Sequence, residues 1–176
     1  MGTFDLDLEL LAVVTIRCTQ RLLKRLGIKP DPAPPPSTTK LGDWYANLLY
    51  TPRGQFILCT SERSLLPVII SAKDARMLLP GKLQLALGAM LMNLGVPFDA
   101  IRPEFSQMEP VAYAKTANRV VLGVMNEFAF VSGDDLADGL DPIEASMQLA
   151  QLLWGPLGSR YPIEVARSLL LGGALC

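Results

Sequence analysis

The sequence predicts an α+β fold in which one mixed, mainly antiparallel sheet is covered by helices. The predicted elements follow one another as strand, helix, a three-stranded meander, helices, strand and three further helices. This order is neither the regular alternation of a parallel α/β fold nor an all-β pattern. The chain has 176 residues, of which 50% are hydrophobic. That length and composition suit a single domain over residues 1–176 with a large buried core.

The chain opens with a short strand and a short helix. Val13–Thr19 is rich in residues that favour strands, and Gln20–Leu26 predicts a helix that ends at Gly27. A proline-rich connector follows at about residues 28–39. Its closely spaced prolines exclude helix and central strand, so we expect an extended surface segment; a proline-recognition motif is the alternative.

Three strands in succession predict a meander. Trp44–Thr51 and Gln55–Ser61 flank a turn that contains Gly54, which is the pattern of a hairpin. Leu65–Ser71 is the third strand, and Pro67 within it favours an edge position.

The remaining helices differ in character. Pro80–Gly95 is apolar nearly all round, which is typical of a central helix or one in an interface, and we expect a homo-oligomer or a protein partner on this ground. Asp99–Phe105 predicts a short helix. Asp141 followed by a proline predicts a helix start, and Pro162 opens the last helix.

Val111–Phe130 predicts a strand that runs directly into a helix, and the turn between them is the candidate site. A helix N-terminus has unpaired N–H groups and a partial positive charge, so it favours anions. The predicted ligand-binding residues of this turn are Lys115, Thr116, Asn118 and Arg119. In a purely structural interpretation, Thr116 caps the helix and Arg119 packs on neighbouring structure.

Two asparagines complete the predicted site. Asn126 lies two turns along the helix on the face of Arg119, and Gly123 between them would leave room for a ligand. The periodicity of an α-helix also places Val120 and Val131 on the core face of this helix. Asn47 is unusual in an apolar strand; it either reaches towards this helix or bonds to a loop.

Composition excludes several kinds of chemistry. The chain has no histidine, which removes Ser-His-Asp catalysis and histidine-ligated metals. The acidic segment 134–141 lacks oxygen ligands where a calcium loop needs them. We therefore expect no metal and no cofactor. Three widely spaced cysteines and an acidic N-terminal segment favour a reduced, cytoplasmic location and no membrane insertion.

Segments spread over most of the chain resemble a known family. The most specific are TTKLGDWYANLL and KTANRVVLGVMNEFAF, and the likeness extends from about Thr15 to Leu171. They resemble an uncharacterised prokaryotic family known only as a domain of unknown function. The resemblance implies a bacterial cytoplasmic protein and supplies no activity.

The function is therefore unknown at this level, and three hypotheses stay open. The first is a non-catalytic binding or regulatory protein that takes a small anionic ligand at the Lys115–Arg119 turn. The second is an enzyme acting on a phosphorylated or carboxylated substrate with Asp43 or Glu127 as base. The third is a nucleic-acid-associated protein that uses cations of the first helix, which a net charge of −1 does not favour. The cations in question are Arg17, Arg21, Lys24 and Arg25.

Overall fold

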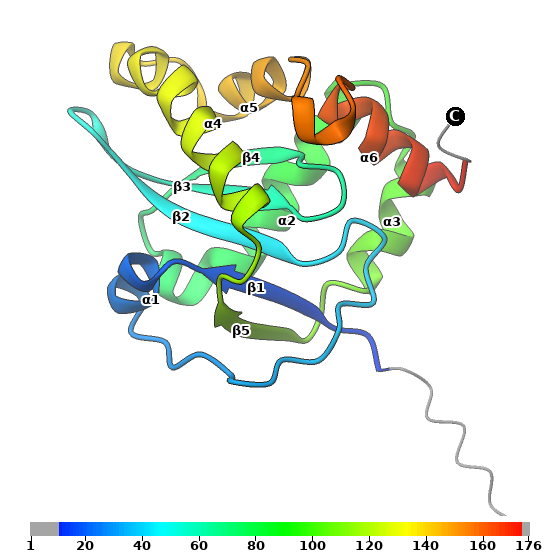
Figure 1. Ribbon diagram of the computed structural model, residues 1–176, viewed down its shortest axis with the longest axis horizontal. Helices are drawn as coiled ribbons and strands as arrows, with labels where there is room; N and C mark the ends of the chain where they lie inside the picture. The colour runs from blue at the N-terminus through cyan, green and yellow to red at the C-terminus, as the bar shows by residue number, and fades with distance from the viewer. Residues whose placement is uncertain (1–10, 174–176) are drawn as a thin grey trace, which may run out of the picture.

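A five-stranded mixed sheet organises the computed structural model, which describes residues 11–173 (Figure 1). Its strand order is β4-β3-β2-β1-β5. The strands are β1 (Val14–Cys18), β2 (Trp44–Thr51), β3 (Gly54–Ser61), β4 (Pro67–Ser71) and β5 (Val111–Lys115). β1 runs parallel to both of its neighbours, whereas β2, β3 and β4 form an antiparallel meander. The predicted α+β class and meander are confirmed, and Pro67 lies in an edge strand.

Six α-helices cover the sheet within the described residues. They are α1 (Gln20–Leu26), α2 (Ala75–Asn93), α3 (Phe98–Ser106), α4 (Arg119–Asp138), α5 (Pro142–Ala150) and α6 (Pro162–Leu171), with a short 3-10 turn η1 (Gly155–Leu157) before α6. α2 begins at Ala75, so the prediction that it starts at Pro80 is wrong. Pro80 lies near the start of the helix, where the lost N–H bond is offset by burial of Leu79 and Leu83. None of the described helices has the length and apolar content to cross a membrane.

The two faces of the sheet bury separate cores. In β2, Trp44 and Ala46 point to a core shared with α1, α2, α3 and α6. Tyr45, between them, points to a second core formed with α4 and α5. This division follows from the alternation of side chains along a strand. Because α1 and α4 belong to different cores, they lie on opposite faces of the sheet (Figure 1).

The proline-rich connector wraps the free edge of β5. The Asp31 N–H donates to the Tyr113 carbonyl at 2.7 Å, on the side of β5 away from β1. Further on, Thr38 exchanges backbone and side-chain hydrogen bonds with Val13, just before β1. Figure 1 shows the connector running along the lower edge of the sheet beside β5. It thus occupies an edge that would otherwise leave backbone groups unpaired.

Candidate functional site

The carboxyl ends of β1 and β5 form a topological switch point. The two strands are adjacent and parallel. β1 leads into α1 on one face of the sheet, and β5 leads into α4 on the other. Chains that leave neighbouring parallel strands towards opposite faces open a crevice between them, and ligands of open α/β sheets bind in such crevices.

A cleft of about 650 Å³ lies at this point. Its lining comes from β1, from the connector, and from the end of β5 with the turn that follows it. In the connector, prolines keep the backbone stiff. The lining residues are Arg17, Lys29, Pro30, Asp31, Pro32, Pro34, Ala114, Lys115, Thr116 and Ala117.

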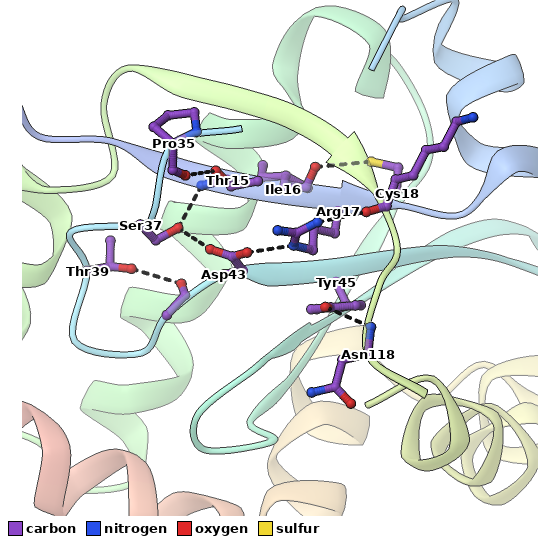
Figure 2. Close-up of polar contacts among 12 residues, drawn as sticks. Thr15, Ile16, Arg17, Cys18, Pro35, Ser37, Thr39, Asp43, Tyr45 and Asn118 are labelled. Atoms are coloured by element: carbon purple, nitrogen blue, oxygen red, sulfur yellow. Dashed lines mark hydrogen bonds and ion pairs between the residues drawn. The ribbon is translucent and has the colours of Figure 1, made fainter. Parts of the chain in front are cut away.

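Arg17 is the best-positioned cation of the cleft. Its Nε donates to Oδ2 of Asp43 at 2.6 Å, and its Nη1 donates to the Lys115 carbonyl at 3.1 Å (Figure 2). An arginine has five N–H donors. Two bonds therefore fix the plane of the guanidinium, and other donors are left for a ligand.

A hydrogen-bond network holds Asp43 in place from the other side. Ser37 Oγ donates to Oδ1 of Asp43 at 2.5 Å and accepts from the Thr15 N–H at 2.9 Å. The Thr15 hydroxyl donates to the Pro35 carbonyl at 3.0 Å (Figure 2). The network ties β1, the connector and the start of β2 together. Both carboxylate oxygens of Asp43 are engaged, which leaves it poorly suited to the role of general base.

The N-terminus of α4 is capped by the protein itself. Oδ1 of Asn118 accepts from the N–H groups of Val120 and Val121 at 2.9 and 3.3 Å. The Asn118 N–H donates to the Tyr45 hydroxyl at 3.1 Å, and burial raises the pKa of that phenol. The cap is thus Asn118 and not Thr116. The N–H groups of Val120 and Val121 are among those expected to bind an anion, and they already donate to Asn118. Attraction for an anion therefore comes mainly from side chains.

The structure separates the predicted site residues into four places, one of which belongs to Asn47 alone. Lys115 and Thr116 line the cleft, with Asn118 directly after its lining. Arg119 is exposed at the first position of α4 and is not a lining residue of the cleft. Asn126 lines a different hollow of about 440 Å³ beside Phe130.

Asn47 of β2 bonds at the junction between β1 and α1. Its Oδ1 accepts from the Thr19 hydroxyl at 2.9 Å and from the Leu48 N–H at 2.9 Å. Of the two alternatives for this residue, the local structural contact is the one observed. The proposed base Glu127 is exposed beside Asn126, away from the cleft.

One expectation for α4 is wrong, and the expectation for Gly123 stays a prediction. Val120 and Val131 are exposed, because the buried arc is centred on Val121 and Phe128 and leaves both of them at its margins. A Cβ placed at Gly123 would meet nothing within 4 Å. The glycine therefore faces open space: no other part of the protein approaches it closely, and there is room beside it.

Sequence reasoning missed the contribution of Arg17 and of the connector. Arg17 had been grouped with the cations of α1, yet it lies in β1 and faces Asp43. The signal that could have found it is alternation: Val14, Ile16 and Cys18 are core residues, so Arg17 points to the other face at the carboxyl end of a strand. Lys29 and the prolines reach the cleft through the Asp31–Tyr113 contact, which joins distant segments.

The described part of the chain offers little support for a metal site or for a reactive cysteine. No group of three or more Cys, Asp and Glu side chains gathers there as a metal site. Cys18 and Cys59 are buried free thiols. Burial raises the pKa of Cys18 to about 12 and raises that of Cys59 as well, so neither thiol is a reactive nucleophile in the folded protein.

A model of the family described as a domain of unknown function (DUF6933) matches residues 15–165. The chain belongs to this family. Among curated proteins and solved structures, none matches the chain. The DUF6933 match extends from β1 into α6, so it includes every residue that lines the cleft.

Proposed function

We propose that the cleft binds a small molecule with an anionic end and an apolar body, and that the protein serves as a binding or regulatory module. The observation that carries the proposal is Arg17. Its guanidinium is fixed by Asp43 and by the Lys115 carbonyl at a switch point of the sheet. An arginine whose orientation is set in advance can bind a carboxylate or phosphate with paired hydrogen bonds at a small entropic cost.

The charge of the lining supports an anionic ligand. Arg17, Lys29 and Lys115 line the cleft, against one carboxylate, Asp31. The Asp31 carboxylate accepts from the Ala33 N–H at 2.9 Å, a local turn contact. Cations thus outnumber carboxylates in the lining, and they come from three separate segments of the chain. Binding that depends on them weakens as salt is added.

The shape and polarity of the cleft support an apolar body. Its volume of about 650 Å³ falls in the usual range of small-molecule sites. Half of the lining is proline or alanine, contributed by the connector and by the segment Ala114–Ala117. A bare inorganic anion would leave this apolar surface uncovered.

We infer binding in preference to catalysis because of how the carboxylates are arranged. Asp43 is bonded to both Arg17 and Ser37, and Glu127 lies beside another hollow. Two observations argue against the nucleic-acid hypothesis, which needs its cations on one face of α1. Arg17 lies in β1 and not on that helix. The Arg21 guanidinium stacks on Tyr50, 5.3 Å from the ring centroid. A cytoplasmic location is part of the proposal, supported by the buried free thiols.

A thermal-shift titration with phenyl phosphate and benzoate tests the proposal, with neutral benzyl alcohol as the matched probe. Ligand at a hundredfold excess over Kd stabilises a protein by about 2.7 kcal/mol. We expect a rise in Tm with the two anions, and at least a fivefold weaker Kd in Lys115→Gln. The matched control is Lys24→Gln, an exposed lysine of α1 outside the lining. Equal binding of benzyl alcohol, or equal loss in both variants, would contradict the proposal.

A further inference from the structure

α2 carries a stripe of uncharged side chains on its outer surface. Leu78, Leu85 and Met92 are spaced at intervals of seven residues and are 52%, 78% and 56% exposed. Gly81 and Ala89 lie between them. At 3.6 residues per turn these five residues fall within an arc of about 80°. We call this set the α2 stripe; the opposite side of the helix, with Leu83 and Leu87, is in the core.

The α2 stripe is symmetric about its own centre. Leu78 and Met92 lie equally far from Leu85 on either side, and so do Gly81 and Ala89. A twofold axis through Leu85 would therefore bring an antiparallel copy of α2 into register. Each large side chain would face a large one, and Gly81 would face Ala89. Self-complementarity of this kind is what an isologous interface requires, and small residues at the paired positions let two helices approach closely.

The charge near the α2 stripe is directed away from it. Lys82 borders the stripe, and its ammonium donates to the Ser71 carbonyl at 2.9 Å and to the Lys73 carbonyl. An antiparallel partner would therefore bring no like charges together along the stripe. This arrangement favours an apolar partner over an acidic or basic one.

The exposed area is large enough for a dimer. Met77, 86% exposed, adjoins the α2 stripe. Together with the three large side chains of the stripe it presents roughly 500 Å² per protomer, so a dimer that covered all of this surface would bury at most roughly 1,000 Å². That reaches the size at which a specific protein–protein interface becomes plausible. A patch of this size matches the largest apolar patches of monomeric proteins, and such patches are often functional.

We propose that the α2 stripe is the twofold interface of a homodimer, in which two α2 helices pack antiparallel with Leu85 at the axis. A competing apolar surface exists on α4, where Phe130 is 87% exposed. Its neighbours in the hollow include Glu127 and Asn126, and it has no symmetric repeat. The test therefore compares the two surfaces directly.

The first experiment measures mass by light scattering coupled to size exclusion at about 100 µM protein, a concentration at which a dimer of micromolar Kd is largely associated. We expect a dimer for the unaltered chain, a monomer for Leu85→Glu and a dimer for Phe130→Glu. Both altered side chains are exposed, and circular dichroism melting checks that both variants fold. A monomeric unaltered chain, or a Leu85→Glu variant that remains dimeric, overturns the proposal. Dissociation by Phe130→Glu alone assigns the dimer to α4 and overturns it too.

The second experiment tests the antiparallel geometry by thiol cross-linking with a short bismaleimide in a Cys176→Ser background. Leu85→Cys should cross-link to itself. Leu78→Cys alone should not, because two such residues would lie about 21 Å apart by helical rise. A mixture of Leu78→Cys with Met92→Cys should cross-link again. Self-cross-linking of Leu78→Cys would indicate parallel helices and overturn the proposal, as would no cross-linking of Leu85→Cys.

Discussion

Replacing Glu104 with alanine should destabilise the protein through a loop that supports the cleft. Glu104 of α3 is 1% exposed, and its carboxylate accepts from the backbone N–H groups of Lys40 and Leu41 at 2.7 and 3.0 Å. This contact fixes the loop that ends at Asp43, the partner of Arg17. Alanine would leave both N–H groups without that acceptor.

The cost can be estimated from these two contacts. Hydrogen bonds to a charged group contribute about 1.5–3 kcal/mol each, and relief of the carboxylate's own burial offsets part of the loss. We expect a net cost of about 3 kcal/mol, which for a chain of this size is a drop in Tm of about 6–12 °C. Glu127→Ala, at an exposed position of α4, is the control and should change stability by less than about 0.5 kcal/mol.

The size of this effect should depend on pH in a defined direction. Burial raises the pKa of Glu104 above its ordinary value of 4.5, against the opposing effect of the Leu41 and Lys40 N–H groups. The folded protein therefore holds the proton more tightly than the unfolded chain. The contribution of Glu104 to the stability of the folded state therefore falls as pH rises from about 4.5 through the raised pKa, and it is level above that pKa.

Thermal melts of the unaltered chain and of Glu104→Ala, recorded from pH 4 to pH 8, measure this directly. The alanine variant lacks the group, so the gap in Tm between the two proteins should be widest near pH 4 and should narrow as pH rises. A gap that widens with rising pH would show that the fold stabilises the Glu104 anion. That result would refute the reasoning.

Three further predictions concern α4 and the buried thiols. Gly123→Ala should raise stability by about 1 kcal/mol, because alanine favours helix and the added Cβ meets open space; a melting curve at or below that of the unaltered chain would contradict this. Asn118→Ala should cost about 1 kcal/mol through loss of the cap, as measured by urea unfolding, and an unchanged midpoint would argue against the observed cap. In a Cys176→Ser background, Cys18 and Cys59 should resist alkylation by iodoacetamide at pH 8 until the protein unfolds, because both are buried with raised pKa values; rapid labelling of the folded chain would show that the core opens.

The parts of the fold that depend on local pattern could be predicted from the sequence. The hairpin pattern around Gly54 predicted the strand Trp44–Thr51, and the Asp141–Pro142 pair predicted the start of α5 from its capping chemistry. The start of α2 was predicted wrongly because a proline usually marks a helix boundary. Here the burial of Leu79 and Leu83 stabilises a helix that continues on both sides of Pro80.

The candidate site depended more on contacts between distant segments. The Lys115–Thr116 turn was found because a strand running into a helix is a local signal. The connector residues that line the cleft were not predicted, because the hydrogen bond between Asp31 and Tyr113 joins residues far apart in sequence. In the same way, the pairing of Arg17 with Asp43 depends on the register of the parallel strands β1 and β2, which no local pattern in the sequence indicates.

The most direct test of the account is to map the binding site by backbone and arginine-side-chain NMR while phenyl phosphate is titrated. We expect saturable shifts at Lys29, at Lys115–Ala117 and at the Arg17 Nε–H, all within the lining of the cleft. We expect much smaller shifts at Asn47 and Asn126, which are not lining residues of the cleft. Saturable shifts confined to other surfaces, or none at millimolar phenyl phosphate, would contradict the claim that this cleft is an anion-binding site.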